Sequence, residues 1–260
     1  MAPMVAKMRK ILTYAPMLLP YFWYHKVVFG IANTKFDISF CVFRESFLAD
    51  QYRIREFLGK QKSADELFVL DLGRNHGFVF YYMMYFIMKS GFEVKKVNYY
   101  GVDPSPLKFV YFNYFKFLRH RNLEINYFLI DRAVVFDEST HARLKYGENN
   151  FGNFNILGSN YQKNLDHAQS RFEYAYINVE TISMDSVKSI VAEHMHSDAL
   201  VAKIDCKNRT DCIFADLLDM MADRHGPYLI SCEKDGSSDR DLSRFAHQNS
   251  RTLCASNILP

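Results

Sequence analysis

Four aspartates lie at the ends of separate apolar runs in this sequence: Asp71, Asp103, Asp131 and Asp205. A short apolar run that ends at a turn is typical of a buried strand. Because ligands bind past the carboxyl ends of strands in an open parallel sheet, we expect these carboxylates to face a ligand there. Any one of them alone would more often be a turn residue or a helix cap. Their recurrence at successive strand ends favours a binding site.

The first of these turns also carries two glycines, Gly73 and Gly77. Gly73 would let a ligand approach the backbone, and Gly77 would let the next helix begin close to the strand. A dinucleotide-binding turn has glycine where this chain has Asp71. A carboxylate there suits a cationic group such as an amino acid ammonium, which favours S-adenosylmethionine over NAD. An ordinary turn between a strand and a helix is the alternative.

The other three aspartates have chemistry that fits the rest of such a ligand. Asp103 could accept hydrogen bonds from two ribose hydroxyls, and Asp131 could accept one from an adenine amino group. Asp205 could remove the proton of an acceptor hydroxyl, or it could cap the next helix. Lys203, two residues earlier, is interpreted as a structural residue that points to the other face of the sheet.

Apolar runs alternate with helical patterns from residue 67 onward. This alternation predicts an α/β fold with a doubly wound, mostly parallel, Rossmann-like sheet. Turn residues crowd residues 138–175, which we interpret as an insertion of hairpins or a mobile lid. Residues 1–66 are expected to form a helical N-terminal extension, and residues 67–260 the main domain. The expected strands are 67–72, 97–102, 125–130, 199–204 and 228–232, and the expected helices are 77–89, 105–120 and 211–223.

Composition excludes several classes of protein. The chain has 260 residues, 49% of them apolar, and a net charge of +3. This balance is that of a folded domain, and it does not call for a nucleic acid partner. The five cysteines are odd in number and include no Cys-x-x-Cys pair, so neither a disulfide framework nor a cysteine zinc site is expected. His194 and His196 are interpreted as solvated, and we expect no metal site.

The N-terminal segment has a pattern of its own. Three basic residues, Lys7, Arg9 and Lys10, precede an apolar run over residues 11–24 that contains Trp23. The run is too short to span a bilayer comfortably. A helix packed on the domain, an anchor at a membrane interface, and a targeting or spanning segment all remain open. We expect a cytoplasmic protein that can touch the inner face of a membrane through residues 1–32.

The motifs resemble those of the FkbM-type family of S-adenosylmethionine-dependent methyltransferases. The first motif of that family, Asp-x-Gly-x-Asn-x-Gly, matches Asp71, Gly73, Asn75 and Gly77. Three later anchors follow in the family order and extend the resemblance over about residues 67–233. They are Asp103-Pro104, Thr181-Ile-Ser-Met-Asp185 and Lys203-Ile204-Asp205.

The resemblance implies an enzyme that methylates a hydroxyl of a sugar, a glycan or a related small molecule. It also implies that the first motif, Asn75 included, binds the cofactor. The chain departs from the family at Arg74, where a small residue is usual, and at Cys206-Lys207-Asn208, where the family has Val-Glu-Gly. These departures keep an alternative open: a catalytically degenerate methyltransferase-fold protein that serves as a binding or scaffold subunit. An NAD-dependent oxidoreductase is disfavoured by Asp71.

Overall fold

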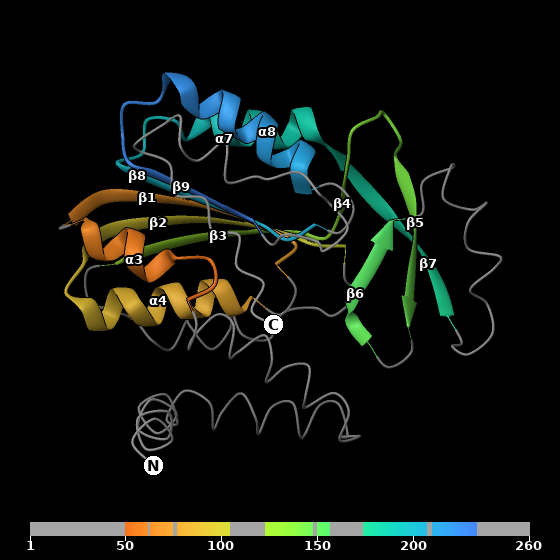
Figure 1. Ribbon diagram of the computed structural model, residues 1–260, viewed down its shortest axis with the longest axis horizontal. Helices are drawn as coiled ribbons and strands as arrows, with labels where there is room; N and C mark the ends of the chain where they lie inside the picture. The colour runs from red at the N-terminus through yellow and green to blue at the C-terminus, as the bar shows by residue number, and fades with distance from the viewer. Residues whose placement is uncertain are drawn as a thin grey trace, which may run out of the picture. The chain divides into compact units, whose positions relative to one another are not determined.

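A five-stranded parallel sheet forms the centre of the described part of the chain (Figure 1). The structure is a computed structural model that describes residues 50–61, 63–74, 77–104, 123–147, 150–156, 174–206 and 210–232. The strands are β1 (Ser63–Leu72), β2 (Glu93–Val102), β3 (Glu124–Ile130), β8 (Ala199–Ile204) and β9 (Tyr228–Cys232). Their order is β3-β2-β1-β8-β9, and each neighbouring pair is parallel. If these five strands are numbered along the chain, their order is 3-2-1-4-5, which matches the first five strands of the Rossmann order 3-2-1-4-5-6.

Helices cover both faces of this sheet (Figure 1). On one face lie α3 (Ile54–Lys60) and α4 (Phe78–Ser90), and on the other lie α7 (Met184–Glu193) and α8 (Thr210–Met220). The expected α/β class with a parallel sheet is therefore confirmed. A short 3₁₀ turn over Met221–Asp223 takes the last residues of the helix predicted to run to 223. The helix expected over residues 105–120 lies outside the described residues.

The strands are long apolar runs because both faces of the sheet are covered. All six residues of β8 are buried, and β1 is buried throughout from Leu67. Both β1 and β2 begin four residues earlier than predicted, at Ser63 and Glu93. The first four residues of each strand alternate between exposed positions and positions that are buried or partly buried. Polar residues at these positions interrupt the apolar run, so the run alone does not predict where the strand begins.

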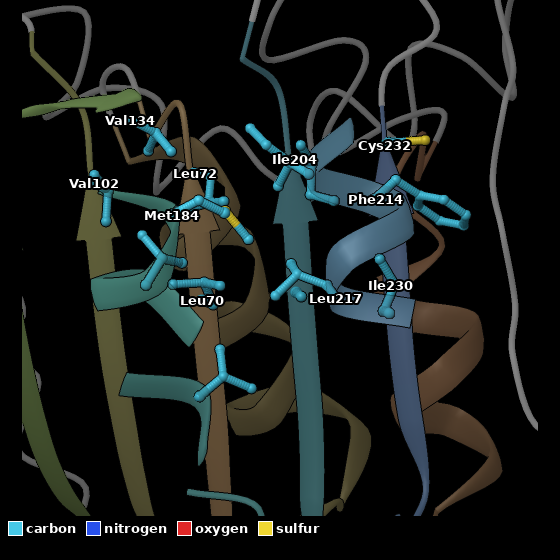
Figure 2. Close-up of a cluster of buried hydrophobic side chains, with 14 of the residues drawn as sticks. Leu70, Leu72, Val102, Val134, Met184, Ile204, Phe214, Leu217, Ile230 and Cys232 are labelled. Carbon is cyan, nitrogen blue, oxygen red and sulfur yellow. The ribbon is translucent and has the colours of Figure 1, made fainter. Parts of the chain in front are cut away.

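A hydrophobic cluster of buried side chains lies between the sheet and the helices α7 and α8 (Figure 2). Helix α7 contributes Met184, Val187 and Val191, which are spaced at helical intervals and are all buried. Its first turn is fixed by Ser183, whose hydroxyl accepts a hydrogen bond from the backbone of Ser186 at 3.1 Å. Each fully buried side chain of this kind contributes about 1.5–3 kcal/mol, so the cluster holds α7 against the sheet.

A second sheet of four strands follows β3 in the chain. It consists of β4 (Ala133–Val135), β5 (His141–Gly147), β6 (Asn150–Ile156) and β7 (Tyr174–Ser183), in the order β4-β7-β5-β6. Strands β5 and β6 are antiparallel neighbours, so the described residues of the expected insertion form a hairpin. Strand β7 leads directly into α7. Residues 157–173 of the insertion lie outside the described residues.

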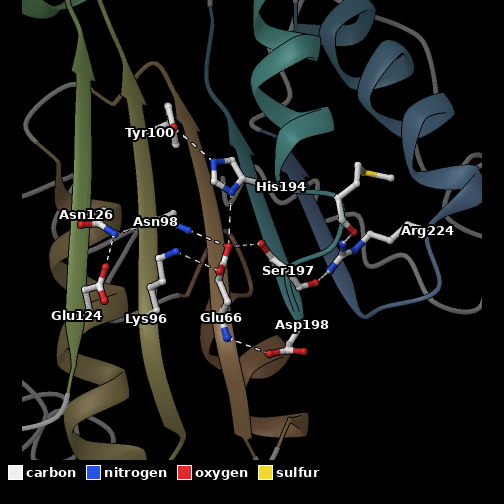
Figure 3. Close-up of polar contacts among 11 residues, drawn as sticks. Glu66, Lys96, Asn98, Tyr100, Glu124, Asn126, His194, Ser197, Asp198 and Arg224 are labelled. Carbon is white, nitrogen blue, oxygen red and sulfur yellow. Dashed lines mark hydrogen bonds and ion pairs between the residues drawn. The ribbon is translucent and has the colours of Figure 1, made fainter.

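A polar network ties α7 to the amino-terminal half of the central sheet (Figure 3). The Glu66 carboxylate of β1 accepts hydrogen bonds from Asn98 at 2.8 Å and from Ser197 at 2.8 Å. His194, just past α7, stacks on Phe68 with ring centroids 4.5 Å apart, and its Nδ1 lies 3.6 Å from Glu66. The interpretation of His194 as a solvated residue is therefore wrong, because the end of α7 packs onto the sheet. His196 is exposed, as expected.

The compact unit that contains both sheets begins at Asp50. Helix α3 therefore belongs to that unit, although it falls within the stretch 1–66 that the sequence analysis assigned to an extension. Among the described residues, no helix combines the length and the apolar character needed to cross a bilayer. Residues 1–32, for which membrane contact was predicted, lie outside the described residues.

Candidate functional site

The four aspartates of the sequence analysis all lie at the carboxyl edge of the central sheet. Asp71 is the penultimate residue of β1, Asp103 directly follows β2, Asp131 directly follows β3, and Asp205 directly follows β8. The chain runs from β1 to β2 on one side and from β8 to β9 on the other, so the order of the strands reverses between β1 and β8. Such a switch point is where open α/β sheets bind ligands.

Gly73 begins the turn after β1, and protein backbone surrounds it closely. Its φ is +72°, and a Cβ at this position would lie 2.1 Å from the carbonyl oxygen of Asp205. Its N–H donates to Val102 at 2.8 Å, and the N–H of Asp205 donates to Leu72 at 2.9 Å. The turns after β1 and β8 therefore pack directly against each other. The protein itself requires glycine here, whether or not a ligand also approaches.

Gly77 ends the same turn and directly precedes α4 as its N-cap. Its φ is +70°, a conformation that favours glycine, and its N–H donates to the carbonyl of Arg74 at 2.7 Å. The positive φ supports the role expected for Gly77, which was to start the helix close to the strand. Asn75 and His76 lie outside the described residues.

The Asp71 carboxylate is enclosed by protein groups. Its exposed fraction is 0%, Oδ2 accepts a hydrogen bond from the Tyr99 hydroxyl at 2.7 Å, and Oδ1 lies 3.1 Å from the Lys203 ammonium. Lys203 also donates to the carbonyl of Gly73. The expectation that Lys203 points to the other face is wrong, because residues two apart in a strand share a face. Asp71 can thus influence a ligand through Lys203 and Gly73, without touching it.

Burial and charge set the protonation of these groups. Burial alone would lower the pKa of the Lys203 ammonium, but the carboxylates of Asp71 and Asp205 outweigh it and hold this pKa above its ordinary value. Burial, with the Asp71 charge next, raises the pKa of the Tyr99 hydroxyl well above 10.0. Burial also raises the pKa of the Cys206 thiol to about 12. Lys203 is therefore a cation, and neither Tyr99 nor Cys206 is an anionic nucleophile at neutral pH.

Asp205, at the end of β8, is more accessible than Asp71 on the neighbouring strand β1. Its side chain is 25% exposed, and its Oδ2 lies 3.6 Å from the Lys203 ammonium. The same oxygen accepts a hydrogen bond from the Tyr52 hydroxyl at 3.3 Å. Tyr52 is not among the residues predicted from sequence, because nothing in the spacing of two residues 153 apart indicates a contact.

Arg74 connects the turn after β1 to the end of β3. Its side chain is 1% exposed and forms an ion pair with Asp131, whose side chain is 51% exposed. The Arg74 side chain lies directly against Gly101 of β2, where a Cβ would be 2.7 Å from the Arg74 Cδ. Asp131, predicted to accept from an adenine amino group, thus accepts from a side chain of the chain itself. Asp103 lies between them in the sheet order and is buried.

No protein-family model, curated protein or solved structure matches this chain. The chemistry of the site therefore has to be argued from its geometry. Its described acidic and basic side chains are the four aspartates, Lys203 and Arg74, so acidic side chains outnumber basic ones by four to two. Such an excess of negative charge fits a ligand that carries a cationic group and hydroxyls.

S-adenosylmethionine meets this requirement in part. Asp103 and Asp131 stand at neighbouring strand ends where ribose hydroxyls and an adenine amino group could be bound, and Asp131 remains half exposed. A direct bond from Asp71 to the ligand ammonium does not fit, because Tyr99 and Lys203 enclose that carboxylate. Carboxylates thus lie at the ends of β2 and β3, where a nucleoside could be bound, while Asp71 could act on an amino acid part only through Lys203 and the turn at Gly73.

Proposed function

We propose that the protein is an S-adenosylmethionine-dependent O-methyltransferase that acts on a hydroxyl of a sugar, a glycan or a related small molecule. The observation that carries the proposal is the excess of carboxylates at the switch point of a parallel sheet ordered like the Rossmann fold. The resemblance of the sequence motifs to the FkbM-type family supports the same chemistry. The finer assignment of the sheet as a methyltransferase domain is part of this proposal.

The cofactor-binding part of the proposal rests on the ends of β1, β2 and β3. Asp103 would accept hydrogen bonds from the ribose hydroxyls, and Asp131 would accept one from the adenine amino group while Arg74 orients it. Gly73, Asn75 and Gly77 would shape the turn beneath the amino acid part, and the buried Asp71–Lys203 pair would hold that turn in place. The bound cofactor would supply an electrophilic methyl group.

The acceptor side of the proposal rests on Asp205. Its carboxylate is partly exposed at the end of β8, beside the switch point. It would accept the proton of the acceptor hydroxyl, so that the oxygen can form a bond to the methyl carbon as the bond to sulfur breaks. Displacement of this kind depends mainly on positioning, with a positioned base contributing about 10²–10⁴-fold.

A second candidate is a binding or scaffold protein that keeps the fold without catalysis. The ion pair between Arg74 and Asp131 favours it, because a side chain of the protein already satisfies a carboxylate predicted to hold the ligand. The enclosure of Asp71 by Lys203 and Tyr99 has the same effect at the other end of the site. This candidate predicts weak cofactor binding, or binding without turnover.

Calorimetric titration with S-adenosylhomocysteine and with NAD tests the proposal first. We expect S-adenosylhomocysteine to bind with a micromolar dissociation constant, worth about 8 kcal/mol, and NAD not to bind. The Asp103→Ala substitution should weaken the binding of S-adenosylhomocysteine by about 1.5–3 kcal/mol, the range for a hydrogen bond to a charged group. Unchanged affinity in that variant would remove Asp103 from the binding site.

Transfer of a labelled methyl group to a panel of glycans and sugars tests the reaction itself. The Asp205→Asn variant should lower transfer by about 10²–10⁴-fold and change cofactor affinity by less than about tenfold. Full transfer by this variant would show that Asp205 is not the base. Cofactor binding with no transfer to any hydroxyl would favour the binding or scaffold protein.

A further inference from the structure

The Asp205 carboxylate is held from two sides by residues that come from different parts of the chain. The Tyr52 hydroxyl donates to Oδ2 at 3.3 Å, and the Lys203 ammonium lies 3.6 Å from the same oxygen. The ammonium also lies 5.4 Å from the centroid of the Tyr52 ring, within the range of a cation–π contact. Tyr52 therefore touches both charged members of the pair.

The short segment over residues 50–53, which we name the strap, has a strained backbone. Asp50 and Arg53 both have positive φ, at 51° and 55°, although neither is glycine. Non-glycine residues in this conformation cost about 1 kcal/mol or more and persist only where surrounding contacts hold them. The two strained residues lie on either side of Tyr52 in the sequence, so the strained conformation determines the position of this tyrosine.

Contacts of Asp50 explain how the strap keeps this conformation. Its carboxylate accepts hydrogen bonds from the backbone N–H groups of Arg55 at 3.1 Å and Glu56 at 3.3 Å, which fixes the first turn of α3. Its carbonyl accepts from the N–H of Arg53 at 2.7 Å. Both Asp50 and Tyr52 are buried. The strap is therefore a fixed part of the domain and sets the place of the Tyr52 hydroxyl.

We infer that Tyr52 is a positioning residue for Asp205 and that the strap belongs to the site. The Tyr52 hydroxyl donor and the Lys203 ammonium at one carboxylate oxygen together restrict the rotation of the carboxyl group, and Lys203 is itself held by Asp71 at 3.1 Å. Hydrogen bonds to the charged form also keep a carboxylate ionised. The inference rests on the proposed function, because the positioning of Asp205 matters for the reaction only if Asp205 is the base.

A double-mutant cycle on stability tests the contact without reference to any reaction. The variants are Tyr52→Phe, Asp205→Ala and their combination, each compared with the parent protein by urea unfolding. We expect the combined effect on the unfolding equilibrium constant to be about threefold to tenfold smaller than the product of the single effects. Tyr100→Phe is the matched control, since its hydroxyl contacts His194 on the face of the sheet that α7 covers and should show no coupling to Asp205.

The pH dependence of methyl transfer then tests positioning. Tyr52→Phe removes one donor and keeps the ring, so we expect turnover to fall about threefold to tenfold. The acid side of the pH–rate profile should move to higher pH, while the affinity for S-adenosylhomocysteine stays within about twofold. The Tyr100→Phe control should change none of these quantities.

The outcomes separate the inference from the proposed function. Additive effects in the cycle, or lower turnover with an unmoved pH profile, would overturn the inference. Coupling in the cycle together with the shifted profile would support it. Coupling in a protein that binds neither S-adenosylmethionine nor S-adenosylhomocysteine would support the positioning of Asp205 by Tyr52 and would overturn the proposed function alone.

Discussion

At the scale of single residues, the Lys203 ammonium offsets the repulsion between carboxylates at the carboxyl edge of the sheet. It is buried between Asp71 and Asp205 and compensates the charge of the fully buried Asp71. Loss of one partner from a buried ion pair leaves the other charge without compensation, which is far more costly than loss of both. The stability of the fold and the charge of the site therefore depend on the same side chain.

Lys203→Met should lower the free energy of unfolding by about 3–5 kcal/mol, because it leaves the Asp71 carboxylate buried and uncompensated. Urea unfolding measures this change. Lys96→Met is the matched control, since Lys96 is more than a third exposed where it pairs with Glu66, and it should cost less than about 1 kcal/mol. Adding Asp71→Asn to Lys203→Met should recover part of the loss, and an absence of any recovery would contradict this account.

Gly73 and Gly91 allow the cost of close packing to be separated from the cost of backbone conformation. Their φ angles are +72° and +73°, but a Cβ at Gly91 would meet no atom within 4 Å. Gly91→Ala should therefore cost about 1 kcal/mol for the left-handed conformation alone. Gly73→Ala should cost more by at least about 1 kcal/mol, because the Cβ meets the Asp205 carbonyl. An equal loss of stability in the two variants, measured by thermal unfolding, would mean that the turns after β1 and β8 can move apart without cost.

At the scale of elements, the junction between the end of α7 and the sheet adds a dependence on pH. Burial lowers the pKa of His194, and the Glu66 carboxylate only partly offsets this effect. The pKa of Glu66 itself is lowered, because hydrogen bonds from Ser197 and the Lys96 ammonium outweigh its burial. The charged form of Glu66 and the neutral form of His194 are thus the forms that hold α7 in place.

The free energy of unfolding should decrease as the pH falls below about 6.5, because the unfolded chain then binds a proton that the folded His194 does not. His194→Phe keeps a ring on Phe68 and should reduce the difference in stability between about pH 7.5 and about pH 5.5. Urea unfolding at the two pH values measures it. His225→Gln, at an exposed residue, should leave the difference unchanged. A parent-like difference in His194→Phe would exclude His194 as its source.

At the scale of the whole molecule, membrane contact through the N-terminal segment is a prediction from the sequence alone. The basic residues Lys7, Arg9 and Lys10 precede an apolar run that contains Trp23, a pattern typical of interfacial membrane contact. We expect anionic vesicles to retain the full chain weakly and to release it as salt is raised, because the attraction between charges is screened. A chain that lacks residues 1–32 should not be retained, and vesicles of neutral lipid are the control. Equal retention of both chains would contradict the prediction.

The sequence by itself determines the central sheet and the edge at which its aspartates lie. Apolar runs such as residues 199–204 predict buried strands because a parallel sheet must cover both of its faces, and the alternation with helices predicts their direction. Two of the strands, β1 and β2, begin four residues before the predicted ones, because exposed polar positions interrupt the apolar pattern there. Hairpins are one of the two interpretations of residues 138–175, and β5 and β6 form one. The parallel pairing of β4 with β7 is not predicted, because the two strands are separated by this turn-rich stretch of sequence.

Only the tertiary structure decides what each aspartate touches. Lys203 reaches Asp71, and Arg74 reaches Asp131, because the register of neighbouring strands and the absence of a side chain at Gly101 bring them together. The contact of Tyr52 with Asp205 joins residues 153 apart and depends on how the strap folds against α4 and the sheet. Spacing along the chain carries no information about such contacts, since they arise from the packing of side chains in three dimensions.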